Sequence, residues 1–191
     1  MRTVGVAQNT ALRESRHDDG QLRELAQRAI VHFERALRLP NNNSHRLGLF
    51  PRIADAALEA GAPLRAAVYA DSAVALAKAC PAERHVPDYL HEAHIVKGHV
   101  ALAANNIAEA TRLLALAATF GGPQAPVLRS FGPDFTLANA LLARGELAAV
   151  RAYLGACATF WEPERIARWQ ARLDRGEHPF MHTGYERPTT P

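Results

Sequence analysis

The chain has 191 residues, of which 48% are hydrophobic and 21% are charged. This balance predicts one folded domain or a short repeat array and excludes an intrinsically disordered chain. No apolar run approaches the roughly 20 residues that a membrane-spanning helix needs, and residues 1–20 contain no segment typical of a secretory signal. Cys80 and Cys157 lie far apart among alanines, which argues against a disulfide scaffold. We therefore expect no membrane span and a cytoplasmic location.

The net charge of +3 is unevenly distributed along the chain. Residues 1–52 carry nine arginines against five acidic residues, whereas the remainder carries 13 Lys or Arg against 14 Asp or Glu. No segment holds the dense basic cluster that is typical of a nucleic-acid surface. We interpret the basic region as a solvated helix face, and binding to nucleic acid is the weakest of three functional hypotheses.

The chain is predicted to be entirely helical. Residues 1–20 are polar and aperiodic and predict a flexible N-terminal arm, and residues 177–191 predict a polar C-terminal tail. Between them, residues 21–176 form a single helical-repeat domain in which apolar residues recur at helical spacing and Gly, Pro or Asn ends each segment. The predicted helices cover residues 21–39, 51–60, 63–79, 87–104, 107–120, 133–144, 146–160 and 163–175.

Short breaks between helices favour antiparallel helical hairpins. Three of these breaks, at Gly61, Asn105 and Gly145, are each preceded by a similar pattern of small and apolar residues. A single hairpin cannot bury its apolar face alone, so repeated hairpins are expected to stack. The repeated positions are Ala54, Ala57 and Leu58; Gly98, Ala101 and Leu102; and Ala138, Leu141 and Leu142.

The helices that follow the second and third breaks also match at a shift of 40 residues. Ile107, Ala110, Leu114 and Ala117 correspond to Leu147, Val150, Leu154 and Cys157. At these residues the chain resembles the tetratricopeptide repeat (TPR) family, over roughly residues 47–160. The breaks are spaced by 44 and 40 residues, against about 34 in the family, and Phe50, His94 and Asp134 occupy the position of its early Trp. The resemblance implies an all-α fold of antiparallel hairpins stacked as a short TPR-like α-solenoid.

The resemblance also implies a binding groove, because the first helix of each hairpin lines a concave surface in that family. The acidic Asp55, and Phe135 where a lysine is expected, do not fit a clamp for a peptide carboxylate. A mixed polar and apolar groove favours an extended peptide or a helix of a partner protein. We therefore expect a protein-binding scaffold without catalysis or cofactor. The implied groove residues are Asp55, Glu59, Ile95, His99, Phe135 and Asn139.

A cluster of histidines supports a second hypothesis. His91, His94 and His99 lie on one predicted helix beside Glu92, with His91 and His94 about 60° apart around its axis. These residue types can bind a metal, although the helix lacks the i, i+4 histidine pair of a zinc protease. The alternative function is therefore a metal-dependent enzyme or a small-ligand sensor centred on this helix.

The C-terminal region carries apolar residues of two kinds. Ile166, Trp169 and Leu173 form a stripe that predicts a terminal capping helix. In the tail, Phe180 and Met181, with Tyr185, form an apolar trio that docks on its own domain or on a partner. The sequence does not decide between these two, and it leaves homo-oligomerisation open.

Overall fold

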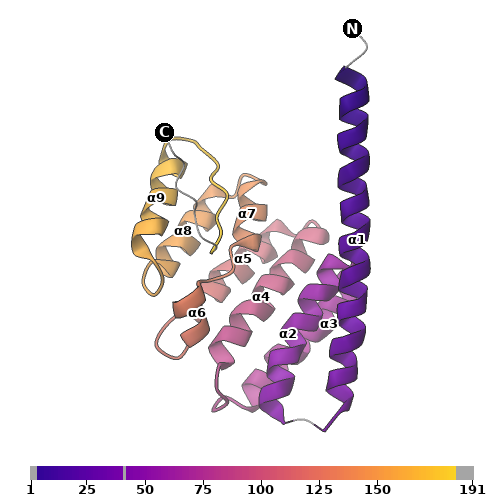
Figure 1. Ribbon diagram of the computed structural model, residues 1–191. Coiled ribbons are helices and arrows are strands. Elements are labelled where there is room, and N and C mark those ends of the chain that lie inside the picture. The colour runs from indigo at the N-terminus through magenta and orange to yellow at the C-terminus, as the bar shows by residue number, and fades with distance from the viewer. Residues whose placement is uncertain (1–3, 41, 184–191) are drawn as a thin grey trace.

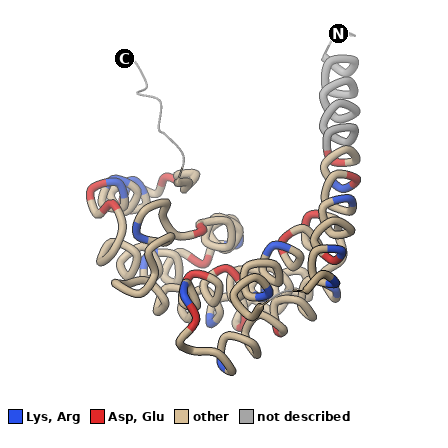
Figure 2. Tube along the Cα trace, turned by 60° about the horizontal axis from the view of Figure 1, so that its bottom comes forward, with Lys and Arg blue, Asp and Glu red and all other residues tan. Residues whose placement is uncertain are grey.

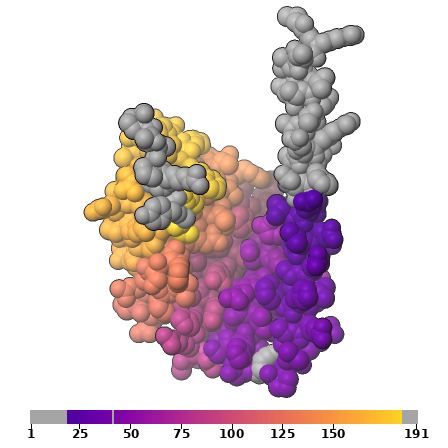
Figure 3. All heavy atoms as spheres, viewed as in Figure 1, coloured from indigo at the N-terminus to yellow at the C-terminus, as the bar shows by residue number. Residues whose placement is uncertain are grey.

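The computed structural model describes residues 4–40 and 42–183, with side chains from residue 19 onward. Within these ranges every regular element is an α-helix and no β-strand occurs, which confirms the predicted all-α class. Successive helices lie beside one another from α1 at one edge to α9 at the other (Figures 1 and 3). The helices are α1 (Val4–Arg38), α2 (Asn43–Glu59), α3 (Pro63–Ala79), α4 (Val86–Ala103), α5 (Ile107–Ala118), α6 (Pro126–Phe131), α7 (Thr136–Leu142), α8 (Leu147–Cys157) and α9 (Pro163–Asp174).

Three helix–helix turns occur at the predicted breaks. Gly61 joins α2 to α3 with φ 74°, Asn105 joins α4 to α5 with φ 56°, and Gly145 joins α7 to α8 with φ 85°. Glycine and asparagine adopt this left-handed conformation most readily. After the second turn, the Asn106 side chain accepts a hydrogen bond from the Glu109 N–H at 3.1 Å and caps α5. The two helices of each pair pack against each other.

The first helix is longer than predicted. α1 starts at Val4, so residues 4–20, which the sequence pattern assigned to a flexible arm, are helical. Farther along, the Glu34 carboxylate pairs with Arg65 of α3 and accepts a hydrogen bond from the Tyr69 hydroxyl at 2.5 Å. These hydrogen bonds lower the pKa of Glu34. They tie the second half of α1 to α3.

The second helix begins at Asn43, eight residues before the predicted start at residue 51. Pro51 lies inside it, although an internal proline costs about 3 kcal/mol because it lacks an N–H. Tertiary packing outweighs this cost, since Leu47 one turn earlier is fully buried in a small cluster with Ala77 and Val86.

A short helix, α6, was not predicted at all. A residue far away in the sequence stabilises it. Asp88 on α4 accepts a hydrogen bond from the Leu128 N–H, in the first turn of α6, at 3.0 Å. This carboxylate acts as the cap that the local sequence does not supply. The predicted helix at residues 133–144 is correspondingly shorter and begins at Thr136.

The interior has two main apolar clusters, and α4 contributes to both. The N-terminal core, formed by α1 to α4, is built largely from small residues: Ala54, Ala57, Ala66, Ala70, Ala73 and Ala93. The C-terminal core, formed by α4, α5 and α7 to α9, contains the large rings Phe135, Tyr153, Trp161 and Trp169.

One close approach connects α4 to the C-terminal helices. A Cβ atom added at Gly98 would lie 2.1 Å from Cδ2 of Leu137 on α7, so the absence of a side chain at residue 98 lets the two helices approach closely. In the described part of the chain, no helix combines the length and the apolar composition that a membrane span requires.

Candidate functional site

A cleft of about 670 Å³ lies where α2, α4, the segment from α6 to α7 and the C-terminal residues 180–183 meet. Three of the six implied groove residues, Asp55, Phe135 and Asn139, line it. The other three do not: Glu59 and His99 lie outside the lining, and Ile95 is 2% exposed in the C-terminal core. His99 instead forms a hydrogen bond between Nε2 and the Thr136 hydroxyl at 3.0 Å.

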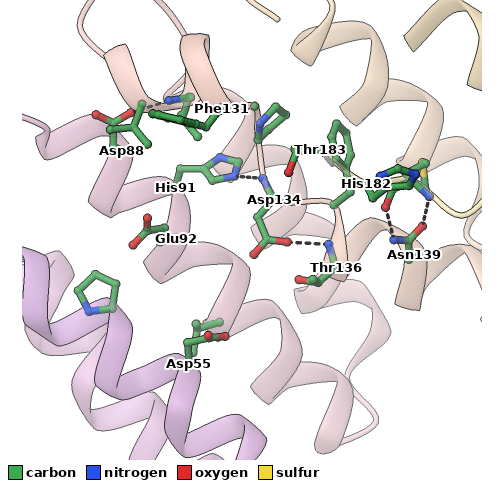
Figure 4. Close-up of a pocket in the computed structure, with 18 of the residues that line it drawn as sticks. Asp55, Asp88, His91, Glu92, Phe131, Asp134, Thr136, Asn139, His182 and Thr183 are labelled. Carbon is green, nitrogen blue, oxygen red and sulfur yellow. Dashed lines mark hydrogen bonds between the residues drawn. The ribbon is translucent and has the colours of Figure 1, made fainter. Parts of the chain in front are cut away.

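One side of the cleft is acidic. Asp55 on α2, Glu92 on α4 and Asp134 before α7 surround the same open space (Figure 4). Desolvation, followed by the negative charge of Asp134, raises the pKa of Asp55 to about 6. Desolvation raises the pKa of Glu92 to about 7, against an opposing effect of Arg52. A positively charged group beside these carboxylates would favour their ionised forms.

The main chain of Asp134 is clamped in place by two aromatic side chains. The Asp134 N–H donates to Nε2 of His91 at 3.0 Å, and the Tyr153 hydroxyl donates to the Asp134 carbonyl at 2.7 Å. Nδ1 of His91 donates to the Ala117 carbonyl at 3.0 Å. Burial lowers the pKa of His91, so the ring is the neutral tautomer that both contacts require. Asp134 therefore holds a defined position at the cleft.

The other end of the cleft holds part of the chain itself. The side-chain amide of Asn139 donates to the Met181 carbonyl at 2.8 Å and accepts from the Met181 N–H at 3.0 Å. Figure 4 shows both bonds beside the labelled His182 and Thr183. The Met181 side chain is 1% exposed and belongs to the C-terminal core. Of the predicted apolar trio, Met181 thus docks on its own domain, whereas Tyr185 lies outside the described residues.

Apolar side chains line the rim of the cleft and face solvent. Phe131 is 73% exposed and Phe180 is 75% exposed, and Val127 on α6 is an exposed apolar residue as well. Apolar side chains gathered in one exposed patch, rather than scattered singly, are typical of a contact surface. The cleft therefore combines an acidic side, a polar main-chain contact and an apolar rim.

The residues of the metal hypothesis are not brought together. His91 has both ring nitrogens in hydrogen bonds, and Nδ1 of His94 contacts the Leu90 carbonyl at 2.6 Å. His99 bonds to Thr136, and Glu92 faces the cleft. Among the side chains from residue 19 to residue 183, apart from residue 41, no group of three metal-ligating residues occurs. The geometry therefore does not assemble the metal centre that the sequence suggested.

The two cysteines are free thiols. Cys157 is fully buried, and desolvation raises the pKa of its thiol to about 12. A thiol with such a pKa stays protonated at neutral pH and is a poor nucleophile.

Basic and acidic positions are interspersed over the described chain in Figure 2.

Sequence reasoning missed several residues of the cleft. The sequence pattern predicts metal-binding roles for Glu92 and His91, and it places Asp134 only where the chain departs from the repeat pattern. Asp88 lies beside the predicted histidine cluster without a role assigned to it, and Phe131 carries no local signal. All five reach the cleft through tertiary packing or the unpredicted helix α6.

No protein-family model matches the chain, and neither the curated proteins nor the solved structures searched contain a significant match. The similarity to the tetratricopeptide family therefore rests on the repeated residues alone.

Proposed function

We propose that the chain is a non-enzymatic scaffold, a short TPR-like stack of helical hairpins that binds an extended segment of a partner protein in the cleft. The observation that carries this proposal is the pair of hydrogen bonds between the Asn139 amide and the main chain of Met181. They support the proposal because a non-helical segment of the chain itself, at Met181, lies against this surface with its main chain bonded to a side-chain amide.

Recognition of this kind does not depend on the side chain that is bound. An amide offers one donor and one acceptor to the N–H and C=O of a single residue, and each neutral bond contributes about 0.5–1.5 kcal/mol. Specificity must then come from the surrounding cleft, where apolar and charged side chains contact the partner's side chains.

The acidic side of the cleft favours a partner segment that carries a positive charge. The charge of Asp134 repels the ionised forms of both Asp55 and Glu92, and Arg52, which also lines the cleft, offsets part of this repulsion at Glu92. A lysine or arginine of the partner would relieve that repulsion, and its alkyl stem fits the aromatic rim at Phe131. The proposed ligand is therefore a basic peptide segment with apolar flanks.

The test is to pan a displayed library of random ten-residue peptides against the full chain. The affinities of the enriched peptides are then measured by titration calorimetry. We expect enrichment of Lys or Arg, and affinities about tenfold weaker for the double variant Asp55→Asn/Glu92→Gln. Glu59→Gln is the matched control, because Glu59 is exposed on α2 outside the cleft lining. Enriched peptides that are neutral or acidic, or binding unaffected by the double variant, would contradict the proposal.

The same titration has a defined pH dependence. The pKa of Asp55 is raised to about 6 and that of Glu92 to about 7, so both gain negative charge as the pH rises from 5.5 to 8. Affinity for a basic peptide should increase over that interval in the wild type. In the double variant it should stay nearly constant.

A further inference from the structure

Residues 179–183 already occupy part of the proposed binding site. Met181 is held by Asn139 through two hydrogen bonds, its side chain is buried, and the Thr183 carbonyl accepts a hydrogen bond from Nη1 of Arg165 at 3.4 Å. Pro179 is buried as well. Residues 180–183 form one end of the cleft wall, and the main chain of Met181 is held as that of a bound peptide would be.

The attachment of this segment differs from that of the helices. α9 ends at Asp174, and the last main-chain to main-chain bond described in this region joins the Glu177 N–H to the Arg172 carbonyl. From residue 178 to residue 183, the main-chain hydrogen bonds described are made with side chains, namely those of Asn139 and Arg165. Another peptide could make the same contacts, because a side-chain amide does not distinguish one backbone from another.

The internal segment does not satisfy the charge of the cleft. Its sequence from residue 177 to residue 183 is Glu-His-Pro-Phe-Met-His-Thr, which contains no lysine or arginine. His182 lines the cleft beside Asn139, and the carboxylates of Asp55, Glu92 and Asp134 line the same cleft together with the guanidinium of Arg52. A segment with a permanent positive charge would keep the main-chain and apolar contacts and add an ionic contact that the internal segment lacks.

We propose that residues 179–183 are an internal occupant of the docking site, and that a partner segment displaces them. This inference rests on the proposed function and names the partner segment more closely. That segment carries an unbranched apolar residue, such as methionine, in the well of Met181, with a lysine or arginine next to it. Methionine suits such a well because its flexible thioether adapts to irregular surroundings.

The first experiment uses the wild-type chain and a synthetic peptide of residues 177–183 in which His182 is replaced by lysine. Hydrogen exchange of the Met181 amide is measured by NMR with and without this peptide. Displacement breaks the bond to Asn139, so exchange of that amide should become at least tenfold faster at saturation. A peptide that also carries Met181→Asp is the matched control and should leave the exchange rate unchanged.

The second experiment uses the full chain with Met181→Asp, which places a charge in the apolar well and releases the segment. The peptide of unaltered sequence 177–183 should bind this variant at least tenfold more tightly than it binds the wild type. Circular dichroism and thermal melting check that the variant is folded. If it is not folded, the wild-type measurement decides: faster exchange at Met181 supports the proposal, and unchanged exchange at the highest peptide concentration overturns it.

The outcomes separate the two proposals. If the lysine peptide binds the wild type and exchange at Met181 stays slow, the internal-occupant proposal is overturned while binding in the cleft stands. If the lysine peptide binds neither the wild type nor the folded Met181→Asp variant, both are overturned. Binding to the variant but not to the wild type supports the internal occupant, since the attached segment then outcompetes the free peptide.

Discussion

The N-terminal and C-terminal cores are packed with side chains of different size. In the first, alanines such as Ala66 and Ala70 lie directly between helices and are fully buried. In the second, Phe135 contacts Tyr153, Trp161 and Trp169 with ring centroids 5.0–5.9 Å apart. Alanines let the helices of the N-terminal core approach closely, whereas large rings fill the space around the irregular segments of the C-terminal core. The cleft lies at the junction of these two modes of packing.

The largest effect is expected when the aromatic core loses its central ring. Phe135→Ala removes a side chain that is 3% exposed and contacts three other aromatic rings. We expect a loss of about 3–5 kcal/mol in the free energy of unfolding, measured by urea denaturation. A loss below 1 kcal/mol would show that the rings pack loosely and that the contrast between the cores is false.

The N-terminal core should lose stability through the opposite change, the introduction of a larger side chain. Ala70→Leu places three additional carbon atoms where the side chain is fully buried between helices. The expected loss is about 1–3 kcal/mol. Ala75→Leu is the control, because Ala75 is exposed on the same helix and the substitution should change stability by less than about 0.5 kcal/mol. Equal effects of the two substitutions would contradict the close packing.

The smallest effect concerns Glu92, on the helix that both cores share. Its folded-state pKa of about 7 exceeds the ordinary 4.5, because burial and the charges of Asp134, Asp55 and Asp88 outweigh the attraction of Arg52. The folded state therefore binds the Glu92 proton more tightly than the unfolded state does. Its ionisation reduces stability progressively as the pH rises from about 4.5 to 7.

Glu92→Gln removes that penalty without changing the size of the side chain. We expect a gain of about 1–2 kcal/mol in stability at pH 8 and no gain at pH 4, measured by thermal or urea denaturation at each pH. A gain of equal size at both pH values would assign the effect to packing rather than to charge.

The helices and their turns could be predicted from the sequence because their causes are local. Gly61, Asn105 and Gly145 adopt the left-handed conformation that their residue types favour, and apolar periodicity located most of the helices between them. Asn139 could be placed in the groove through the repeat pattern, but the segment that it binds could not be identified.

The remaining features depend on contacts between distant residues. α2 continues through Pro51 because Leu47, one turn earlier on the same helix, is buried against Ala77 and Val86. α6 forms under a cap supplied by Asp88, 40 residues away. The acidic cleft exists because Asp55, Glu92 and Asp134 meet only after three elements have packed. No single-sequence pattern signals such encounters.

The imidazole of His91 makes the stability of the fold sensitive to acidic pH. Nε2 accepts the Asp134 N–H only while it carries no hydrogen. A second proton on the ring would set two donors against each other in the interior. Because the folded-state pKa of His91 is lowered below 6.5, the stability gained from this contact is complete above pH 6.5 and declines as the pH falls below it. At acidic pH the hydrogen bond from the Asp134 N–H to His91, which positions Asp134 at the cleft, would be lost.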